Sequence, residues 1–494
     1  MESTSTKKVV FNSVIYSASG LMLKCFGFFL LPLYTAYLTT TDYGINSIAS
    51  SFTSTMCFVV AFSLYSAVLR FYVDLKDDPE QLKRFYGTVS LFVFLSGVFF
   101  FVLMTVFRGP LTRYVFQGID YYPIVFACLI ALIFHCEQLV FDKVLKSQQR
   151  AVKSSILSIA FFFTTLAFNI LFVVILKKGA LGTIMASGIS YFCYTAYFVI
   201  DLLVKKQIHF CFDWPLLKRA LKYSLPIMPH NLSTQIALLV SKVLIGDVVS
   251  LSGLGVYTVA SQFGNMADTV QVYVDNAYGP WLYEKLHQKE TNYKQSIRDI
   301  SKMLSAVIGF FFLGLSLFAH DYIVLFINKS YVDAWKYVPM IVLVFAMKTS
   351  YYFYVEVLFY YKKASRYLFT ATLTSSLVNI LLSYYLIPLY GVFGSILADG
   401  ISMLIRIAII VFISKKFDDI GLRLGDFILN YGIVCLFIAG GLSLTIFKYG
   451  NHFSIVNFLF KIVVCVAYLG LIALMNRKQI RPVVNFVKKK LKKA

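Results

Sequence analysis

Two stretches of the sequence, 212 residues apart, decide how the chain is organised. Residues 179–190 read GALGTIMASGIS and residues 391–402 read GVFGSILADGIS, with seven identities in twelve positions. A second pair, TDYGINSIASSF at 41–52 and SGLGVYTVASQF at 252–263, has nearly the same offset of 211 residues. Small residues recur in membrane helices because they let backbones pack closely, but that does not explain a shared offset. The sequence therefore predicts an internal duplication.

The duplicated segments belong to a chain that is too apolar for a water-soluble fold. Its 494 residues are 59% hydrophobic and only 14% charged, whereas a soluble domain is about 25% charged. Apolar stretches of about 20 residues recur from end to end, and each is long enough to cross a hydrocarbon core about 30 Å thick. We predict an all-α polytopic membrane protein of about fourteen transmembrane helices. The expected spans are 10–37, 45–69, 86–107, 121–142, 154–176, 180–203, 223–249, 254–280, 303–320, 336–361, 367–388, 392–413, 427–446 and 455–475.

The duplication divides these spans into two lobes. Six spans separate each segment from its copy, and an even number gives both copies the same direction across the membrane. We therefore expect two parallel-repeat six-helix lobes, a cavity between them, and a terminal helix pair outside the repeat. The predicted divisions are an N-lobe at 1–203, a cytoplasmic linker at 204–222, a C-lobe at 223–413, the terminal helices at 427–475 and a basic cytoplasmic tail at 476–494.

The basic residues predict the orientation of the chain. With fourteen spans both termini share one side, and the segments on that side hold 34 of the 46 Lys and Arg residues, against seven on the other side. Under the positive-inside rule both termini are cytoplasmic. The formal charge of +22 then reports topology, and we expect no nucleic-acid partner because no soluble fold gathers these charges. The tail RPVVNFVKKKLKK at 481–493 suits binding to anionic lipids, or is simply a solvated end.

Cations inside the predicted spans indicate a binding site, because a charge at the bilayer centre is costly and must face water or a partner. These cations are Lys24, Lys242, Lys348 and Arg406, and Arg70 lies at the inner end of the second span. Lys24 and Lys348 lie midway along their spans and have no opposite charge nearby in sequence. Unpaired cations favour an anionic ligand, and Lys and Arg are the usual binders of phosphate. Lys461, near the outer end of the last span, is expected to snorkel toward the interface.

Acidic residues inside the spans are candidates for coupling to an ion, Na⁺ or H⁺, or for pairing with the cations. They are Glu137, Asp268, Asp275, Glu356 and Asp399. Asp399 and Arg406 are seven residues apart, hence on one helical face, and a self-neutralising pair is the alternative to a functional role for them. No cofactor, metal site or catalytic constellation is predicted. The six His residues have no metal-ligand spacing, and the eight Cys residues form no C-x-x-C pair.

Tyrosines and prolines add two further expectations. The stretch SYYFYVEVLFYY at 350–361 is crowded with tyrosines, whose rings suit contact with a sugar, although packing explains them equally well. Pro32 in the first span, with Pro226 and Pro229 near the inner end of the seventh, removes backbone donors and predicts helix breaks. Such breaks serve as hinges or are passive kinks.

Several motifs, in their order along the chain, resemble a known family. The motifs LLPLYTAYLTTTDYG (30–44), SLYSAVLRFY (63–72), SLPIMPHNLS (224–233), GLGVYTVASQF (253–263) and GPWLYEKL (279–286) resemble the polysaccharide transporter branch of the MOP superfamily, the Wzx-type oligosaccharide flippases. The resemblance implies a fourteen-helix fold of two six-helix lobes with a cationic cavity between them. It also implies a transporter rather than an enzyme. Such a flippase moves undecaprenyl-diphosphate-linked oligosaccharide repeat units from the cytoplasmic to the outer leaflet of the bacterial cell membrane by alternating access, for surface polysaccharide biosynthesis.

The resemblance also implies partners and leaves alternatives open. The expected partners are the lipid-linked oligosaccharide, anionic lipids at the tail, and the polymerase and glycosyltransferases of the same pathway. Where many relatives have S-D-R in the seventh span, this chain has Ser241, Lys242 and Val243, so a coupling-ion role there is not implied. A MATE-like drug or metabolite antiporter is the alternative, although a drug cation favours carboxylates over Lys24 and Lys348. A membrane polysaccharide polymerase or glycosyltransferase is a further alternative, against which the short outer loops argue.

Overall fold

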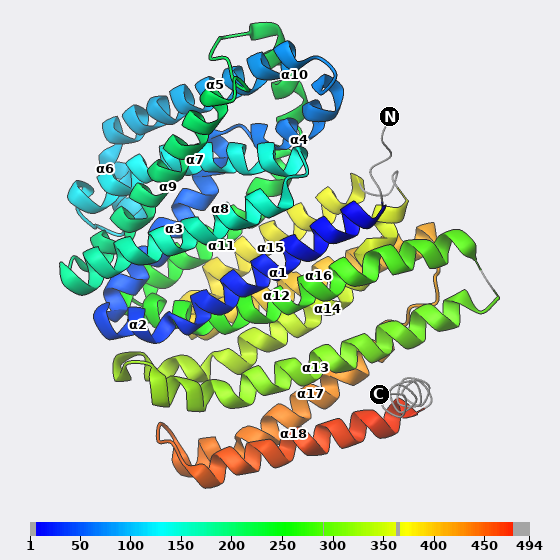
Figure 1. Ribbon diagram of the computed structural model, residues 1–494. Helices are drawn as coiled ribbons and strands as arrows, with labels where there is room; N and C mark the ends of the chain where they lie inside the picture. The colour runs from blue at the N-terminus through cyan, green and yellow to red at the C-terminus, as the bar shows by residue number, and fades with distance from the viewer. Residues whose placement is uncertain (1–5, 290, 362–365, 478–494) are drawn as a thin grey trace, which may run out of the picture. The chain divides into compact units, whose positions relative to one another are not determined.

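The protein is built from helices. The structure, a computed structural model, describes residues 6–289, 291–361 and 366–477, and every regular element in these ranges is a helix (Figure 1). A helix satisfies its backbone polar groups internally, which a chain surrounded by lipid requires. The prediction of an all-α membrane protein is confirmed. The lipid-binding tail predicted at 481–493 lies outside the described residues.

The chain divides into two compact units. Unit 1 holds the described residues up to Gly255 together with Ser383–Val392, and unit 2 holds Val256–Leu382 and the described residues from Phe393 onward. The helices of unit 1 are α1 (Thr6–Phe29), α2 (Leu31–Tyr37), α3 (Thr40–Val60), α4 (Leu64–Leu75), α5 (Pro79–Val106), α6 (Arg108–Pro110), η1 (Leu111–Val115), η2 (Tyr121–Val125), α7 (Phe126–Ser147), α8 (Ala151–Asn169), η3 (Ile170–Ile175), α9 (Gly179–Val204), α10 (Trp214–Ser224) and α11 (Met228–Val248).

Unit 2 begins within a long helix that starts in unit 1. Its helices are α12 (Leu251–Gln288), α13 (Tyr293–Phe326), η4 (Lys329–Lys336), α14 (Val338–Tyr360), α15 (Arg366–Tyr390), α16 (Val392–Phe417), α17 (Leu424–Leu444), η5 (Thr445–Tyr449) and α18 (Ile455–Met475). The compact units are defined by contacts, whereas the predicted lobes are copies of a sequence repeat. The lobe boundaries at 203 and 223 therefore remain a prediction.

The helices account for all of the predicted spans. Among the described residues, eleven helices are long and apolar enough to cross a membrane, and the bent pair α3 and α4 makes twelve. The seventh and eighth predicted spans are occupied by α11 and α12, which have 21 and 38 residues. Both exceed the length of a span, so it is their polar content that separates them from the other twelve. These two helices carry several of the predicted site residues.

The predicted proline breaks are confirmed. α1 ends at Phe29, and α2 begins at Leu31 with Pro32 in its first turn. α10 ends at Ser224, and α11 begins at Met228 with Pro229 in its first turn. A proline is tolerated in the first turn because its missing N–H has no partner there in any helix.

The second pair of repeat segments meets in a reciprocal contact. A Cβ on Gly44 of α3 would lie 2.0 Å from the carbonyl oxygen of Leu251, and a Cβ on Gly255 of α12 would lie 1.9 Å from that of Thr40. Leu251 is the copy of Thr40, and Gly255 is the copy of Gly44, at the same offset of 211 residues. Gly44 therefore meets the copy of Thr40, and Thr40 meets the copy of Gly44. Such a reciprocal contact is what a two-fold axis produces. The duplication is visible in the structure as local symmetry.

The first pair of segments begins at equivalent glycines. Gly179 and Gly391 have φ angles of +55° and +58°, and they open α9 and immediately precede α16. Only glycine adopts this left-handed conformation at little cost. The matched glycines therefore mark the same chain reversal in both copies of the repeat.

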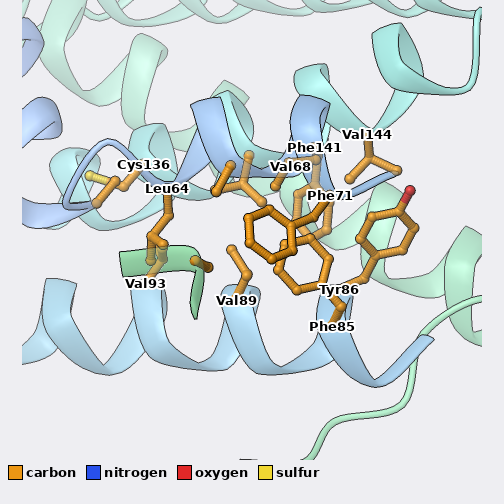
Figure 2. Close-up of a cluster of buried hydrophobic side chains, with 14 of the residues drawn as sticks. Leu64, Val68, Phe71, Phe85, Tyr86, Val89, Val93, Cys136, Phe141 and Val144 are labelled. Atoms are coloured by element: carbon orange, nitrogen blue, oxygen red, sulfur yellow. The ribbon is translucent and has the colours of Figure 1, made fainter. Parts of the chain in front are cut away.

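A cluster of buried side chains holds α4 against its neighbours in unit 1. Leu64, Val68 and Phe71 of α4 pack on residues of α5 and α7 (Figure 2). The rings of Phe71 and Phe85 stack with centroids 5.4 Å apart. Burying a large apolar side chain contributes about 1.5–3 kcal/mol when the alternative is water. The cluster therefore fixes how α4 is rotated against α5 and α7, so that Leu64, Val68 and Phe71 face the core.

A sharp bend separates α4 from α3. The two helices are bent by 47°, and Phe62 and Ser63 between them have φ angles of +47° and +53°. Non-glycine residues avoid this conformation unless the surrounding structure imposes it. The bend gives α4 a direction of its own, and this direction positions Arg70.

A buried ion pair attaches the last helix of the terminal pair to the rest of unit 2. Lys461 of α18 and Asp321 of α13 are 0% and 2% exposed, and Lys461 Nζ lies 2.6 Å from Asp321 Oδ2. His320 is buried beside them, and its Nε2 lies 2.8 Å from the carbonyl oxygen of Gly450. The expectation that Lys461 snorkels toward the interface is wrong. Its buried carboxylate partner is 140 positions earlier in the chain, where sequence inspection does not connect the two.

Candidate functional site

Arg70 lies at the edge of a cavity in unit 1. Its Nη1 forms an ion pair with Asp74 Oδ1 at 2.6 Å, one turn further along α4. The adjoining cavity has a volume of about 420 Å³. Side chains of α4, α7 and α10 line it, among them Tyr65, Leu69, Arg70, Val73, Lys143 and Tyr223. The cavity thus combines two cations, two phenol rings and an apolar wall.

Lys143 is a member of this cavity that the sequence did not single out. It is partly buried, and its Nζ lies 5.7 Å from the centroid of the Tyr65 ring. Among the described residues it has no carboxylate within ion-pair distance. In the sequence, Lys143 is one of many basic residues near an inner loop, so nothing distinguishes it from a charge that only sets topology.

Lys242 lies deeper along α11, where the family pattern has an acidic residue. Its side chain is partly buried, and Nζ donates a hydrogen bond to Ser51 Oγ of α3 at 2.7 Å. This neutral hydroxyl is its polar partner among the described residues, and no carboxylate pairs with it there. Lys242 is therefore an intramembrane cation without a compensating charge in unit 1.

Lys24 and Glu137 complete the predicted residues of unit 1. Lys24 is exposed on α1 and has no ion-pair partner among the described residues. Glu137 of α7 is 2% exposed, and its Oε2 accepts a hydrogen bond from Ser90 Oγ at 2.8 Å. Its second oxygen, Oε1, has no hydrogen-bond partner in the described part of the chain. Glu137 lies in the apolar interior of the unit, away from the cavity beside Arg70.

Lys348 is paired, in contrast to the expectation of an isolated cation. Its Nζ lies 2.6 Å from Asp268 Oδ1, and the Tyr352 hydroxyl donates to the same oxygen at 3.1 Å. Asp268 is on α12 and Lys348 on α14, 80 positions apart. The two helices therefore neutralise a charge that looks unpaired within its own span.

The remaining acidic residues of α12 and α14 continue the same polar stripe. The Tyr283 hydroxyl donates to Glu356 Oε2, and Gln271 donates through Nε2 to Thr349. Asp275 Oδ1 has no hydrogen-bond partner among the described residues, and Glu356 is close enough to interact with Asp275 electrostatically. The stripe therefore contains three carboxylates and one cation, an excess of acid.

The tyrosines of residues 350–361 are held by the protein. The Tyr352 hydroxyl donates to Asp268, and the buried Tyr354 hydroxyl donates to the carbonyl oxygen of Leu422 at 3.0 Å. The ring of Tyr360 lies 5.7 Å from that of Tyr283. Packing and internal hydrogen bonds, the alternative to a sugar contact, account for these three rings.

Asp399 and Arg406 each form a hydrogen bond to a neighbouring helix. Asp399 Oδ1 accepts a hydrogen bond from Asn379 Nδ2 at 2.8 Å, whereas Arg406 Nε donates to Ser375 Oγ at 2.8 Å. Both partners lie on α15, which packs on this face of α16. The two charges still interact electrostatically, so the self-neutralising pair stays a prediction. Sequence reasoning missed Asn379 and Ser375, which carry no charge.

The predicted residues thus form separate groups. In unit 2, Lys348 joins Asp268, and Asp275 lies near Glu356, while Asp399 and Arg406 share one helix. In unit 1, the predicted residues Lys24, Arg70, Glu137 and Lys242 lie on four different helices, and no hydrogen bond or ion pair joins them to one another in the described part of the chain.

Comparison with known proteins identifies the family. A family model described as polysaccharide biosynthesis protein matches residues 9–286, which is more than half of the chain. None of the curated proteins matches the sequence. Among solved structures, the lipid II flippase MurJ in its inward closed conformation is similar to this chain with 16% identity and a TM-score of 0.71, over 94% of this chain and 100% of that one.

Transporters of the same superfamily are also similar in structure. A MATE protein in complex with MaD3S has 16% identity and a TM-score of 0.55, over 83% of this chain and 96% of its own. A MOP superfamily transporter from Pyrococcus furiosus has 14% identity and a TM-score of 0.54, over 84% of this chain and 97% of its own. Identities this low establish the fold alone. From the family match and the fold together, the chain belongs to the polysaccharide biosynthesis protein family and has the fold of MOP superfamily transporters.

Proposed function

We propose that the protein is a flippase for undecaprenyl-diphosphate-linked oligosaccharide repeat units. It moves them by alternating access from the cytoplasmic to the outer leaflet of the bacterial inner membrane, for surface polysaccharide biosynthesis. Family membership supports the pathway, and the structural similarity to a lipid II flippase supports the class of cargo. Both termini are cytoplasmic in this proposal, and the polymerase and glycosyltransferases of the pathway are its partners.

Lys242 is the observation that carries the proposal. An ammonium group among membrane helices is costly unless a charge or water compensates it, and the described partner of Lys242 is only the hydroxyl of Ser51. A diphosphate supplies the missing negative charge and several strong acceptor oxygens. Lys24, exposed on α1 without an ion-pair partner, is a further cation of unit 1 for this anion, and Arg406 is a candidate anion-binding residue of unit 2. Lys348 contributes only if it exchanges Asp268 for the substrate.

The experiment compares Lys242→Gln with Lys242→Arg in a strain that lacks the native gene. We expect Lys242→Gln to lower surface polysaccharide at least tenfold and to cause lipid-linked repeat units to accumulate on the cytoplasmic side. Lys242→Arg should retain a substantial part of the activity because it keeps the charge. Lys146→Gln, an exposed lysine on α7, is the matched control. Normal output from Lys242→Gln, at equal protein in the membrane, would contradict the proposal.

A MATE-like antiporter is the second candidate, favoured by the acidic stripe of α12 and α14. Asp268, Asp275 and Glu356 suit a cationic drug, or a coupling ion such as Na⁺ or H⁺ in either kind of transporter. Neutralising Asp275 with Asn separates the two functions. Lost drug resistance with normal polysaccharide output would identify the antiporter, whereas lost polysaccharide output would place the carboxylate in the flippase cycle. We propose no enzymatic reaction and no cofactor for the chain.

A further inference from the structure

The cavity at α4, α7 and α10 has the composition of a lipid-phosphate site. Two of its lining residues, Arg70 and Lys143, are cations, while Leu69, Val73 and Ile227 are apolar. A volume of about 420 Å³ is within the range of pockets that hold small molecules. The Arg70 side chain is 52% exposed and Lys143 is partly buried, so both cations can meet a ligand that enters the open cavity. The mixed lining therefore indicates a ligand with an anionic end and an apolar end.

The two cations are available in different ways. Lys143 forms no ion pair within 4.0 Å among the described residues, although the neighbouring Asp142 attracts it electrostatically, and its Nζ lies 5.7 Å from the centroid of the Tyr65 ring. Arg70 is paired with Asp74, and the two side chains are 52% and 37% exposed. A surface pair of this kind is worth at most about 1 kcal/mol. A phosphate group can therefore displace Asp74 from Arg70 and bridge to Lys143.

The phenol rings of the cavity are held in place by contacts outside it. Asn231 of α11 donates a hydrogen bond through Nδ2 to the Tyr65 hydroxyl at 2.7 Å. Tyr223, at the end of α10, packs edge-on against Phe71 with ring centroids 6.3 Å apart. Phe71 itself belongs to the buried cluster of unit 1. The rings are thus fixed by the core, as a recognition site requires.

The proline break between α10 and α11 completes the cavity wall. Ile227 lies between the two helices, next to Pro226, and lines the cavity. Lys242 is 15 residues further along α11, which is about 22 Å of helix at 1.5 Å per residue. Unit 1 therefore has two cations, Arg70 of α4 and Lys143 of α7, around the cavity before the start of α11, and a third, Lys242, further along α11. The cavity is at the end that the charge distribution predicts to be cytoplasmic.

We propose that this cavity is a loading site that binds the diphosphate of a prenyl-linked substrate before translocation. Lys143 and Arg70 bind the phosphates, Tyr65 and Tyr223 contact the first sugar or isoprene unit, and Leu69, Val73 and Ile227 contact the start of the chain. The assignment of the ligand rests on the proposed flippase function. Lys143 is the residue that defines the site, since it lines the cavity beside the Tyr65 ring and forms no ion pair within 4.0 Å in the described part of the chain.

The test measures binding to the purified full-length protein in detergent. Farnesyl diphosphate is the probe, and inorganic diphosphate and phosphatidylglycerol are the comparison ligands. We expect farnesyl diphosphate to bind at least tenfold more tightly than either of them. Lys143→Gln and Arg70→Gln should each weaken its binding about tenfold, whereas Lys143→Arg and the control Lys146→Gln should stay within about twofold of the wild type. Equal thermal stability and a monodisperse elution profile establish that the variants are folded.

Several results would overturn the loading site. Wild-type affinity in Lys143→Gln would show that Lys143 does not belong to the site. Equal binding of inorganic diphosphate would show that the site accepts any phosphate, and equal binding of phosphatidylglycerol would show that it accepts any anionic lipid. Lys242→Gln separates this proposal from the flippase function, since it should fail in transport but keep the component of farnesyl diphosphate binding that Lys143→Gln loses. Lost binding in Lys143→Gln together with normal transport in Lys242→Gln would leave the loading site standing and contradict the proposed function of Lys242.

Discussion

Four cations inside the membrane region have polar partners of different kinds. Lys242 donates to a hydroxyl, Lys348 and Lys461 each meet a carboxylate, and Arg406 donates to Ser375. A charge in a medium of low dielectric is stable only with such partners. The cation with the weakest compensation is the best candidate for a ligand. By this criterion Lys242 and Lys143 rank above Lys348, which hydropathy and position alone had favoured.

Gly44 and Gly255 are predicted to tolerate no side chain. Their Cβ atoms would meet carbonyl oxygens at 2.0 Å and 1.9 Å, so Gly44→Ala and Gly255→Ala must push α3 and α12 apart. Overpacking of this kind costs about 1–3 kcal/mol or more. A clear drop in the thermal midpoint in detergent is the expected result.

Gly27→Ala is the control for these glycine variants. A Cβ on Gly27 of α1 meets nothing within 4 Å, and replacing a helical Gly by Ala gains up to about 1 kcal/mol. Gly27→Ala should therefore match or exceed the thermal midpoint of the wild type. If all three variants had the same thermal midpoint, the reciprocal contact of the repeat would not contribute to stability.

At the scale of elements, charged pairs decide which helices lie together. The ion pair between Lys461 and Asp321 attaches α18 to α13, and the pair between Lys348 and Asp268 attaches α14 to α12. Apolar side chains contribute little specificity here, since lipid tails are as apolar as leucine. Polar contacts therefore select neighbours among helices whose surfaces are otherwise similar.

The pair between α18 and α13 should be strongly coupled. Lys461→Met or Asp321→Leu alone leaves one partner buried without its counterion, which costs about 3–5 kcal/mol. The double variant Lys461→Met with Asp321→Leu should recover most of that loss, because it removes both charges. Chemical unfolding in mixed micelles provides the double-mutant cycle. Additive losses in the double variant would show that the two residues act independently.

The pair between α12 and α14 should respond to a charge swap. Asp268→Asn leaves Lys348 without its carboxylate and is expected to lower both thermal stability and transport. Exchanging the residues, Asp268→Lys with Lys348→Asp, restores the attraction and should restore stability. Transport by the exchanged variant then tells whether Lys348 itself meets the substrate. If stability stays low after the exchange, surrounding groups such as Tyr352 favour one direction of the pair, with the carboxylate on α12 and the ammonium on α14.

At the scale of the whole molecule, the charge distribution predicts the orientation in the membrane. A single cysteine at Lys206→Cys should be protected from a membrane-impermeant maleimide in intact cells, whereas Asp120→Cys should react. Both positions are exposed, so the membrane alone separates them. The eight native cysteines must first be replaced by Ser or Ala. If only Lys206→Cys were labelled, the orientation would be the opposite of the predicted one.

The sequence by itself determined the class of fold and the duplication. Apolar length and the positions of Pro32 and Pro229 are properties of a local stretch, so they predicted the helices and their breaks directly. The shared offset of the repeat segments predicted the duplication, whereas the reciprocal contact of Gly44 and Gly255 was found only in the structure. These features follow from the chain because lipid and backbone geometry act on each segment separately.

Only the tertiary structure decided which charges are compensated and where a cavity lies. Asp268 is 80 positions from Lys348, and Asp321 is 140 positions from Lys461, so no periodicity connects them. Lys143 became a candidate because the bend after α3 and the break before α11 place Tyr65, Arg70 and Tyr223 around it. The environment of an ionisable group is set by neighbours from other helices. That environment, rather than the residue type, separates a binding residue from a structural ion pair.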